Sequence, residues 1–390
     1  MLSCSLLGKM PLNPSTCFIN HQFFKNSDLI LKFRPIEFFR TFSALGVVWI
    51  HSWILFQNPS LSLGKIDFFK LISFVGNGVD FFFVISGFLM YLALQKKEFS
   101  LINYAYFVKK RFLRIAPLYY ISILVYFLVF NFLQNQDISF KDVVIDALFL
   151  NNHFKVNIAY TFWSLAVEWL FYLIIPFLFI FRSRKKQLYT FLLICVVSIV
   201  RLYQVEASSK LFLTPNMPLP LFIEFGWGIL IGMIITNDAW KLKFQVKQSW
   251  LNLLIGFGIL YFGRVMRLTE LVENAGSFAI FLKVLSGPVM TFGFAYIMWM
   301  LIGSIGKFNV FVEHRFFQFI GRLSFGIYIW HVLILSIIPW NQLSTYLPDS
   351  IAMILTFLMV SAITTLLSWL TYELVEKRYF NSSLSSKHIS

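Results

Sequence analysis

Ten long runs of apolar residues, spread along the whole chain, constrain the fold more than any other feature. Each run approaches the roughly 20 residues that an α-helix needs to cross a bilayer, and the fifth and seventh are the shortest. They lie near 36–57, 71–94, 115–133, 161–181, 188–203, 219–236, 250–263, 278–302, 317–339 and 351–371. The sequence therefore predicts an all-α membrane protein, a polytopic bundle of about ten transmembrane helices.

The composition agrees with a protein that is solvated by lipid. Hydrophobic residues make up 58% of the 390 residues and charged residues 13%, whereas soluble domains average roughly 45–50% and 25%. This balance excludes an ordinary soluble enzyme and a disordered chain. Because no Ser-, Pro- or Gly-rich linker divides the runs, we expect one transmembrane domain over 35–380 between cytoplasmic tails at 1–34 and 381–390.

The basic residues give the direction of the spans. With the N-terminus in the cytoplasm, 24 of the 33 Lys and Arg residues fall in cytoplasmic segments and 9 in outer ones. This bias predicts an even number of spans with both termini in the cytoplasm. It also assigns the net charge of +15 to loops that meet anionic lipid, so we expect membrane lipid and no nucleic acid among the partners. The three cysteines form no CxxC pair, so we expect no disulfide and no metal site.

Ionisable residues inside the apolar runs are the first candidates for function, because each costs at least about 2.5–3.5 kcal/mol in hydrocarbon. Counting at 1.5 Å per residue places four of them within very roughly 10–14 Å of the outer boundary: His51, Asp80, Glu168 and His331. Histidine with a carboxylate is typical of general acid–base catalysis. We expect His51 to act as the base, Asp80 or Glu168 to orient it, and His331 to assist in substrate binding or proton transfer. Alternatively, each is a lone polar residue that a neighbouring helix satisfies.

Arg40 shares a helix face with His51. Eleven residues turn a helix by 1100°, which is three turns plus 20°, and separate the two side chains by about 16.5 Å. A cation at one end of a face and a base at the other suit a long ligand with an anionic head and a reactive tail. Arg111 and Arg114 also share one face and are further candidates for phosphate binding. Both groups also fit the simpler role of cytoplasmic topology charges.

The same residues carry a family resemblance. The matching segments are Arg40-x10-His51, GVDFFFVISGFL (78–89, with Phe82, Phe83, Ser86 and Gly87), KKRFLRIAPLYY (109–120, with Arg111 and Arg114), FWSLAVEWLFYLIIP (162–176, with Glu168), GRLSFGIYIWH (321–331) and YELVEKRYF (with Glu376). In this order and spacing the chain resembles the acyltransferase-3 family of integral-membrane O-acyltransferases over roughly 35–380. No SGNH hydrolase-like domain is expected after the last motif.

The resemblance implies an acyl-CoA donor, usually acetyl-CoA, that binds from the cytoplasm, and an acceptor hydroxyl on a carbohydrate or glycolipid toward the outer face of the membrane. We expect this membrane to be a plasma membrane, the bacterial inner membrane. It implies that Arg40, Arg111 and Arg114 hold CoA phosphates and that Phe82, Phe83, Ser86 and Gly87 belong to the donor site. His51 would be a general base or a transient acyl carrier, and both routes stay open. The alternative is a proton-coupled secondary transporter or lipid-linked-glycan flippase, in which the buried ionisable residues form a proton relay.

Overall fold

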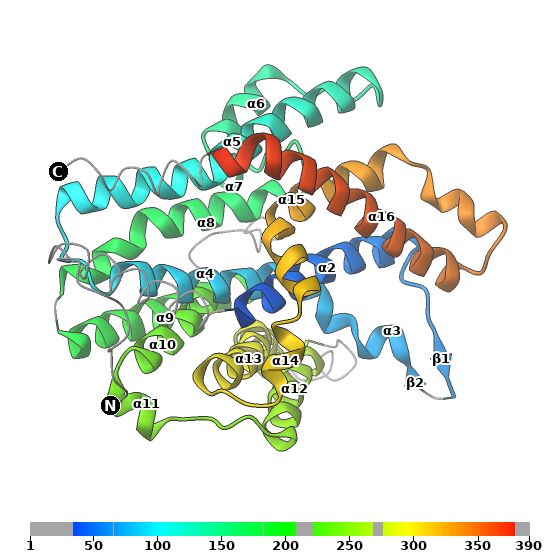
Figure 1. Ribbon diagram of the computed structural model, residues 1–390. Coiled ribbons are helices and arrows are strands. Elements are labelled where there is room, and N and C mark those ends of the chain that lie inside the picture. The colour runs from blue at the N-terminus through cyan, green and yellow to red at the C-terminus, as the bar shows by residue number, and fades with distance from the viewer. Residues whose placement is uncertain (1–33, 65, 182, 208–220, 268–275, 379–390) are drawn as a thin grey trace, which may run out of the picture.

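The structure is a computed structural model that describes residues 34–64, 66–181, 183–207, 221–267 and 276–378. It is a bundle of helices joined by short connections (Figure 1). The α-helices are α2 (Pro35–Leu55), α3 (Phe68–Leu71), α4 (Gly78–Leu94), α5 (Leu101–Phe132), α6 (Phe140–Ala147), α7 (Asn151–Phe154), α8 (Phe162–Ile174), α9 (Arg184–Ala207), α10 (Phe222–Ile235), α11 (Asp238–Lys243), α12 (Trp250–Val265), α13 (Gly276–Gly303), α14 (Phe308–Val312), α15 (Arg315–Ile337) and α16 (Asp349–Thr371).

Smaller elements complete the chain. A hairpin of two-residue strands, β1 (Ser62–Leu63) and β2 (Ile66–Asp67), precedes α3. Short 3-10 segments cover Ser73–Asn77, Ile175–Ile180 and Trp340–Thr345, and a π-helical turn, Tyr372–Glu376, continues α16. The fold class is therefore all-α apart from this hairpin in the part of the chain that the structure describes.

Each of the ten predicted runs corresponds to a helix. Eight helical segments are long and apolar enough to cross a membrane, and α10 and α12 are apolar but shorter. The expectation of a short fifth span is wrong, because α9 has 24 residues, and the sixth run is short instead. The chain thus has the helices of a multi-pass membrane protein. The count of ten spans and the cytoplasmic termini stay predictions, and the expected tails fall almost entirely outside the described residues.

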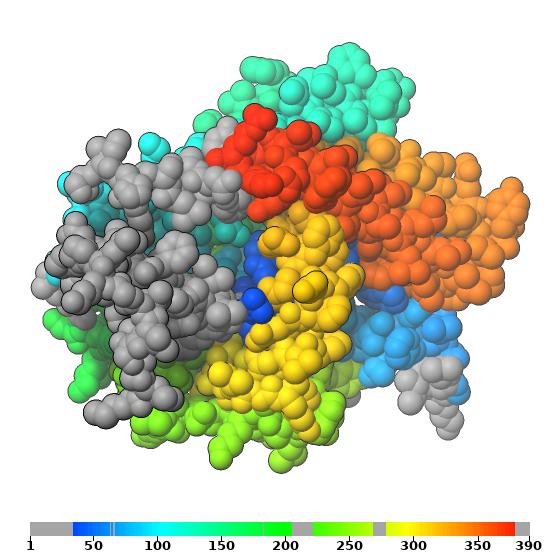
Figure 2. All heavy atoms as spheres, in the orientation of Figure 1, coloured from blue at the N-terminus to red at the C-terminus, as the bar shows by residue number. Residues whose placement is uncertain are grey.

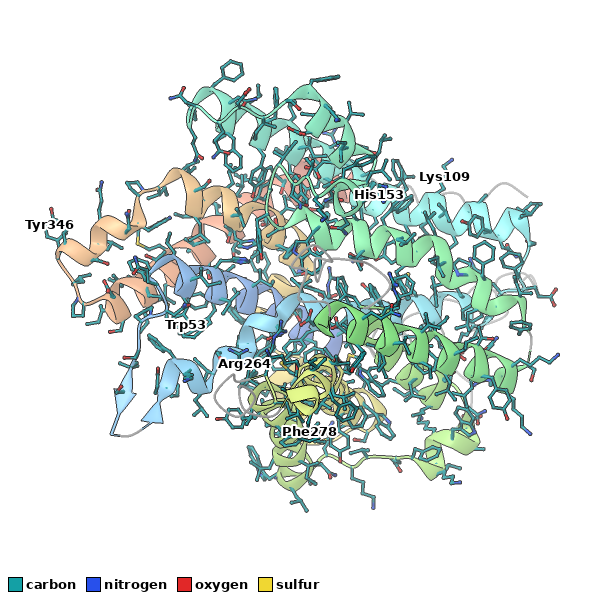
Figure 3. The ribbon with its side chains drawn as sticks, turned by 180° about the vertical axis from the view of Figure 1, so that it is seen from behind. Trp53, Lys109, His153, Arg264, Phe278 and Tyr346 are labelled. Carbon is teal, nitrogen blue, oxygen red and sulfur yellow. The ribbon has the colours of Figure 1, made fainter. Side chains whose placement is uncertain are left out.

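Labelled residues show which parts of the chain lie at each end of the bundle. Viewed from behind, Trp53 near the end of α2 and Tyr346 in the connection before α16 lie toward one end, and Lys109 of α5 lies toward the other (Figure 3). Helices α2 and α5 therefore run in the same direction through the bundle. On the face shown in space-filling form, α15 and α16 lie side by side (Figure 2).

Helix α2 packs against both α4 and α15, and glycines let the backbones of α4 and α10 touch. A Cβ on Gly87 would lie 1.9 Å from the carbonyl oxygen of Phe225, and one on Gly228 would lie 1.9 Å from that of Val84. Gly87, which the motif assigned to the donor site, therefore serves helix packing, because small residues let membrane helices approach closely.

We expect Gly87→Ala to disrupt this contact, because the added methyl group overlaps a backbone oxygen that cannot move alone. The thermal midpoint of the detergent-solubilised protein should fall by at least about 5 °C, as a loss of a few kcal/mol implies for a chain of this size. Gly258→Ala is the matched control, because nothing lies within 4 Å of its added Cβ. Equal midpoints for the two variants would contradict the packing account.

Candidate active site

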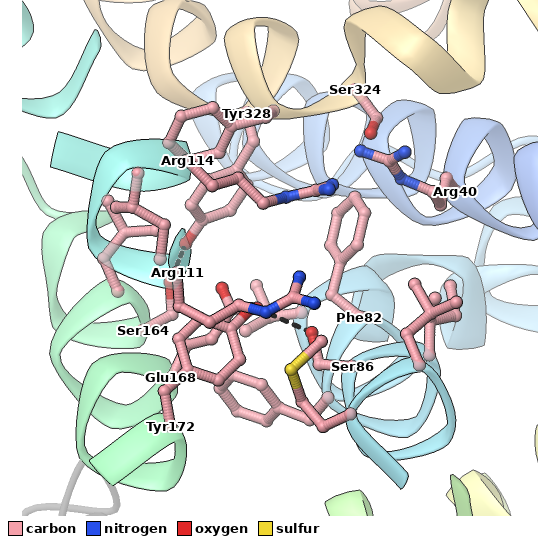
Figure 4. Close-up of a pocket in the computed structure, with 18 residues that line it drawn as sticks. Arg40, Phe82, Ser86, Arg111, Arg114, Ser164, Glu168, Tyr172, Ser324 and Tyr328 are labelled. Atoms are coloured by element: carbon pink, nitrogen blue, oxygen red, sulfur yellow. Dashed lines mark hydrogen bonds between the residues drawn. The ribbon is translucent and has the colours of Figure 1, made fainter. Parts of the chain in front are cut away.

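A cavity opens between α2, α4, α5, α8 and α15, and the space there, the solvent at its mouth included, is about 740 Å³. Six of the seven residues predicted to bind the donor line it, and only Gly87 does not. The lining residues include Arg40, Phe82, Phe83, Ser86, Leu89, Arg111, Arg114, Ile115, Ser164, Glu168, Tyr172, Ser324, Phe325 and Tyr328 (Figure 4). Residues distant in sequence thus meet in one mixed cavity, with guanidinium groups set among aromatic and aliphatic side chains.

The arginines make this cavity suitable for an anion. The guanidinium groups of Arg40, Arg111 and Arg114 point into the same space (Figure 4). Arg40 donates to Glu37 at 3.3 Å. The Nε of Arg111 is buried and has no hydrogen-bond partner among the described residues. Since an uncompensated buried donor is costly, a phosphate oxygen placed there would stabilise the site, and arginine forks suit phosphate geometry.

A second, more polar cavity of about 570 Å³ shares Arg40, Arg114 and Phe325 with the first. Its other lining residues are Glu37, Arg322, Tyr372 and Glu376. We call it the vestibule, because it lies between α2 and α15 next to Arg40, where it adjoins the first cavity. Arg322 was not among the predicted site residues, although it lies in the segment GRLSFGIYIWH.

Glu168 belongs to the arginine cavity. Its Oε1 accepts a hydrogen bond from the Ser86 hydroxyl at 2.6 Å and another from the Tyr172 hydroxyl. The prediction that Glu168 could orient His51 is wrong in this structure, because neither histidine contacts it. The physical reason is the register of α8 against α15: Ser164, one turn before Glu168, already lies against Tyr328, and His331 is nearly a further turn away along α15.

The two histidines lie together. Nε2 of His331 is 3.1 Å from Nδ1 of His51, and their ring centroids are 5.0 Å apart. Nδ1 of His331 is 2.7 Å from the carbonyl oxygen of Tyr328, and Nδ1 of His51 is 3.0 Å from that of Val47. Only an N–H can bond to a carbonyl oxygen, so both rings carry the proton on Nδ1. The single Nδ1 hydrogen of His51 is then shared between the carbonyl oxygen of Val47 and the lone pair on Nε2 of His331, and Nε2 of His51 remains as a basic nitrogen.

Asp80 lies deeper than the histidines. A Cβ on nearby Gly78 would touch the carbonyl of Ser43, which is eight residues or about 12 Å along α2 from His51. The structure therefore brings the two histidines together and separates Asp80 from them, and the distance of each residue from the membrane boundary stays a prediction. Counting residues from the ends of the runs assumed that Asp80 lies beside His51. In the structure, the residue beside His51, Ile50, packs against Gly76, which comes before α4 begins.

Asp80 pairs with another carboxyl group. It accepts from the side-chain amide of Asn77 at 2.7 Å, and its carboxyl group is in contact with that of Glu224 on α10. Glu224 is buried, and its Oε2 has no hydrogen-bond partner among the described residues. Sequence reasoning missed Glu224, although an acidic residue in the run LFIEFGWGILIG was an available signal.

Comparison with known proteins identifies the family of the chain. Residues 34–373 match the family model described as "Acyltransferase domain", Acyl_transf_3. The chain belongs to the acyltransferase-3 family. A relative named "Putative acetyltransferase ORF330", from Acidianus two-tailed virus, is 28% identical over 301 residues, which cover 75% of this chain and 81% of the viral protein. Like its family, this chain is an acyltransferase with several membrane-spanning helices.

The connection between α5 and α8 of this acyltransferase contains a buried carboxylate. Asp146 of α6 is fully buried; its Oδ2 accepts the backbone N–H of Ile158 at 2.8 Å, and its Oδ1 has no hydrogen-bond partner among the described residues. Burial is the main cause that raises the pKa of Asp146 to about 7, and the charge of nearby Asp142 adds to it. A carboxyl group whose pKa is raised in the folded state favours folding at low pH.

We therefore expect the acyltransferase to lose stability as the pH rises from about 4 to about 7, by up to about 4 kcal/mol from this one group. Asp146→Asn should flatten this part of the profile, because the amide oxygen can still accept from Ile158 and the amide has no charge. The thermal midpoints of both proteins at pH 5 and pH 8 provide the measurement. Parallel profiles for the two proteins would contradict the assignment.

Proposed function

We propose that this protein is an acyl-CoA-dependent membrane O-acyltransferase that moves an acyl group, the acetyl group in the first instance, from CoA to a hydroxyl of a cell-surface or lipid-linked carbohydrate. One observation carries the proposal: an arginine-lined cavity lies at one end of a face of α2, and a histidine pair with a free basic nitrogen lies at the other. The separation of Arg40 and His51 along this face is about 16.5 Å. That span suits a donor with anionic phosphates at one end and a thioester at the other.

The donor would enter through the vestibule. Arg40, Arg114 and Arg322 offer charge-assisted hydrogen bonds to its phosphates. The pantetheine arm would then follow the cavity past Phe82, Leu89 and Ile115, whose apolar surfaces suit an uncharged chain. The thioester would lie at the outer end, toward the histidines.

The histidine pair supplies the base. Nε2 of His51 takes the proton of the acceptor hydroxyl, and the oxygen attacks the thioester carbonyl carbon. The C–S bond then breaks, and the thiolate of CoA takes the proton back from His51, so an ester and a free thiol result. His331 holds the ring of His51 in the tautomer that this step needs. If His51 attacks the thioester itself, the C–S bond breaks, CoA leaves as the thiolate and an acyl-histidine forms. The acceptor hydroxyl then attacks the acyl carbon, its proton passes to the thiolate, and the imidazole is released.

A second candidate is the proton-coupled transporter or flippase, and the Asp80–Glu224 pair favours it. The buried carboxyl groups of Asp80 and Glu224 lie close together within the bundle, and acidic residues placed in this way form proton relays in transporters. A transporter of this kind would work without CoA. Dependence of the product on acyl-CoA therefore separates the two functions.

The test compares four strains at equal membrane abundance of the protein: wild type, a deletion, and the deletion complemented with His51→Ala or His153→Ala. The readout is the amount of base-labile, ester-linked acyl groups on surface glycans, measured by NMR before and after mild alkali. We expect the ester to be absent in the deletion and in His51→Ala, and present in His153→Ala, a histidine of α7 outside the site. An ester that persists in the deletion would contradict the proposal.

A further inference from the structure

The donor cavity and the histidine pair are separate compartments in this structure. Neither His51 nor His331 is among the described residues that line the cavity. The outermost residues that line it are Val79 on α4, Ser164 on α8 and Tyr328 on α15. His331 follows Tyr328 by three residues, or about 4.5 Å, along α15. An acyl group in the cavity therefore meets the Tyr328 ring before it can reach a histidine.

Hydrogen bonds hold the Tyr328 ring in this position. Its hydroxyl is 2.5 Å from the hydroxyl of Ser164 and donates to the carbonyl oxygen of Thr161 at 2.9 Å. Figure 4 shows the hydroxyl directed at Ser164, with a hydrogen bond between the two side chains. The ring lies edge-on to Phe82, with centroids 6.2 Å apart. Side chains from α4, α8 and α15 therefore pack together and close this end of the cavity.

Tyr328 also touches the histidine pair. Its ring centroid is 5.8 Å from that of His331, and its backbone carbonyl accepts the Nδ1–H of the same histidine. The side chain therefore faces the donor cavity while the backbone fixes the tautomer of His331. A rotation of the side chain about its own bonds would open the path and leave that backbone contact in place.

We propose that the side chain of Tyr328 is a movable partition between the donor cavity and the histidine pair, held closed by Ser164 and Thr161, and that it swings aside for the acyl group to reach His51. The closed state keeps the thioester away from water on the outer side. Individual hydrogen bonds contribute only modestly to net stability, so the open state is thermally accessible. The role of the partition in acyl transfer rests on the proposed function. Its role as a physical barrier between the cavity and the histidines does not.

The first test measures how fast a reagent from the outer side reaches the cavity, and it needs no CoA. Leu89 lines the cavity on its inner part, so Leu89→Cys in a background with Cys4, Cys17 and Cys195 changed to Ser reports on access. A membrane-impermeant maleimide is added to the outer side of sealed vesicles. We expect Tyr328→Phe, which keeps the ring and removes both hydrogen bonds of the hydroxyl, to raise the outer labelling rate by about tenfold.

Tyr126→Phe is the matched control. Its hydroxyl is also buried and bonded to α15, donating to the carbonyl of Ile329 and accepting the N–H of Leu333, but it does not line the cavity. We expect the outer labelling rate to stay at the wild-type value in this variant. Reagent added from the cytoplasmic side should label all three proteins at one rate, which shows that the cavity itself is intact. Equal outer rates for Tyr328→Phe and Tyr126→Phe would overturn the partition.

The second test follows acetyl-CoA hydrolysis by the reconstituted protein without an acceptor. With the partition loosened, water reaches the thioester beside His51, and we expect Tyr328→Phe to release acetate about fivefold faster than wild type or Tyr126→Phe. If the wild-type protein neither binds nor cleaves acetyl-CoA, the proposed function fails while the labelling result still decides the partition. If Tyr328→Phe labels faster but hydrolysis does not rise, the partition does not guard the thioester and its catalytic role is overturned.

Discussion

Replacing His51 by alanine should lower the rate of acyl transfer by about 10³-fold, the range in which positioned general bases contribute. The reason is the tautomer of the pair. With Nδ1 of His51 bonded to Val47 and His331, Nε2 is the basic nitrogen that remains for the acceptor. His51 lies far from the arginines, so the affinity for the donor should stay within about twofold of the wild-type value.

The measurement is the initial rate of label transfer from radiolabelled acetyl-CoA, with donor affinity taken from CoA binding to the same preparation. His153→Ala controls for the loss of a histidine and should retain the wild-type rate. A His51→Ala protein that transfers at more than about a tenth of the wild-type rate would remove His51 from the chemistry. Loss of CoA binding in that variant would instead indicate a structural role.

Replacing Arg114 by glutamine should raise the KM for acetyl-CoA by about 10- to 100-fold with a much smaller change in kcat. Arg114 lines both the cavity and the vestibule, and a charge-assisted hydrogen bond to phosphate contributes about 1.5–3 kcal/mol. Because the thioester reacts at the other end of the donor, the loss should appear as weaker binding rather than slower chemistry.

Lys109→Gln is the matched control for this second prediction. Lys109 is an exposed basic residue on the same helix, and it lines neither cavity. We expect its KM to stay within about twofold of wild type, because screening by salt weakens exposed charges. A similar rise in KM for both variants would show that general positive charge, and not the arginine site, attracts the donor.

Sequence reasoning succeeded where one helix decides the outcome. The helices follow the apolar runs because each run is long enough to span a bilayer. Arg111 and Arg114 line the same cavity because a spacing of three residues puts them on one face of α5. The pairing of Glu37 with Arg40, three residues apart on α2, is readable from the same periodicity.

The same reasoning failed where two helices must be aligned. Counting residues from an assumed boundary cannot give the register of α4 or α8 against α2, so Asp80 and Glu168 were both assigned to histidines that they do not contact. The contacts of Glu224 with Asp80 and of Ser164 with Tyr328 join residues 144 and 164 positions apart. No single-helix pattern encodes such pairs, although buried polar residues in apolar runs mark the candidates.

The most direct test of the central claim uses the purified protein in sealed proteoliposomes, with acetyl-labelled acetyl-CoA on the cytoplasmic side and an oligosaccharide acceptor extract on the outer side. The account predicts base-labile label on the outer acceptor, release of one CoA thiol for each ester formed, and no ester with His51→Ala. Outer label that appears without acetyl-CoA consumption, or an equal yield from His51→Ala, would contradict it.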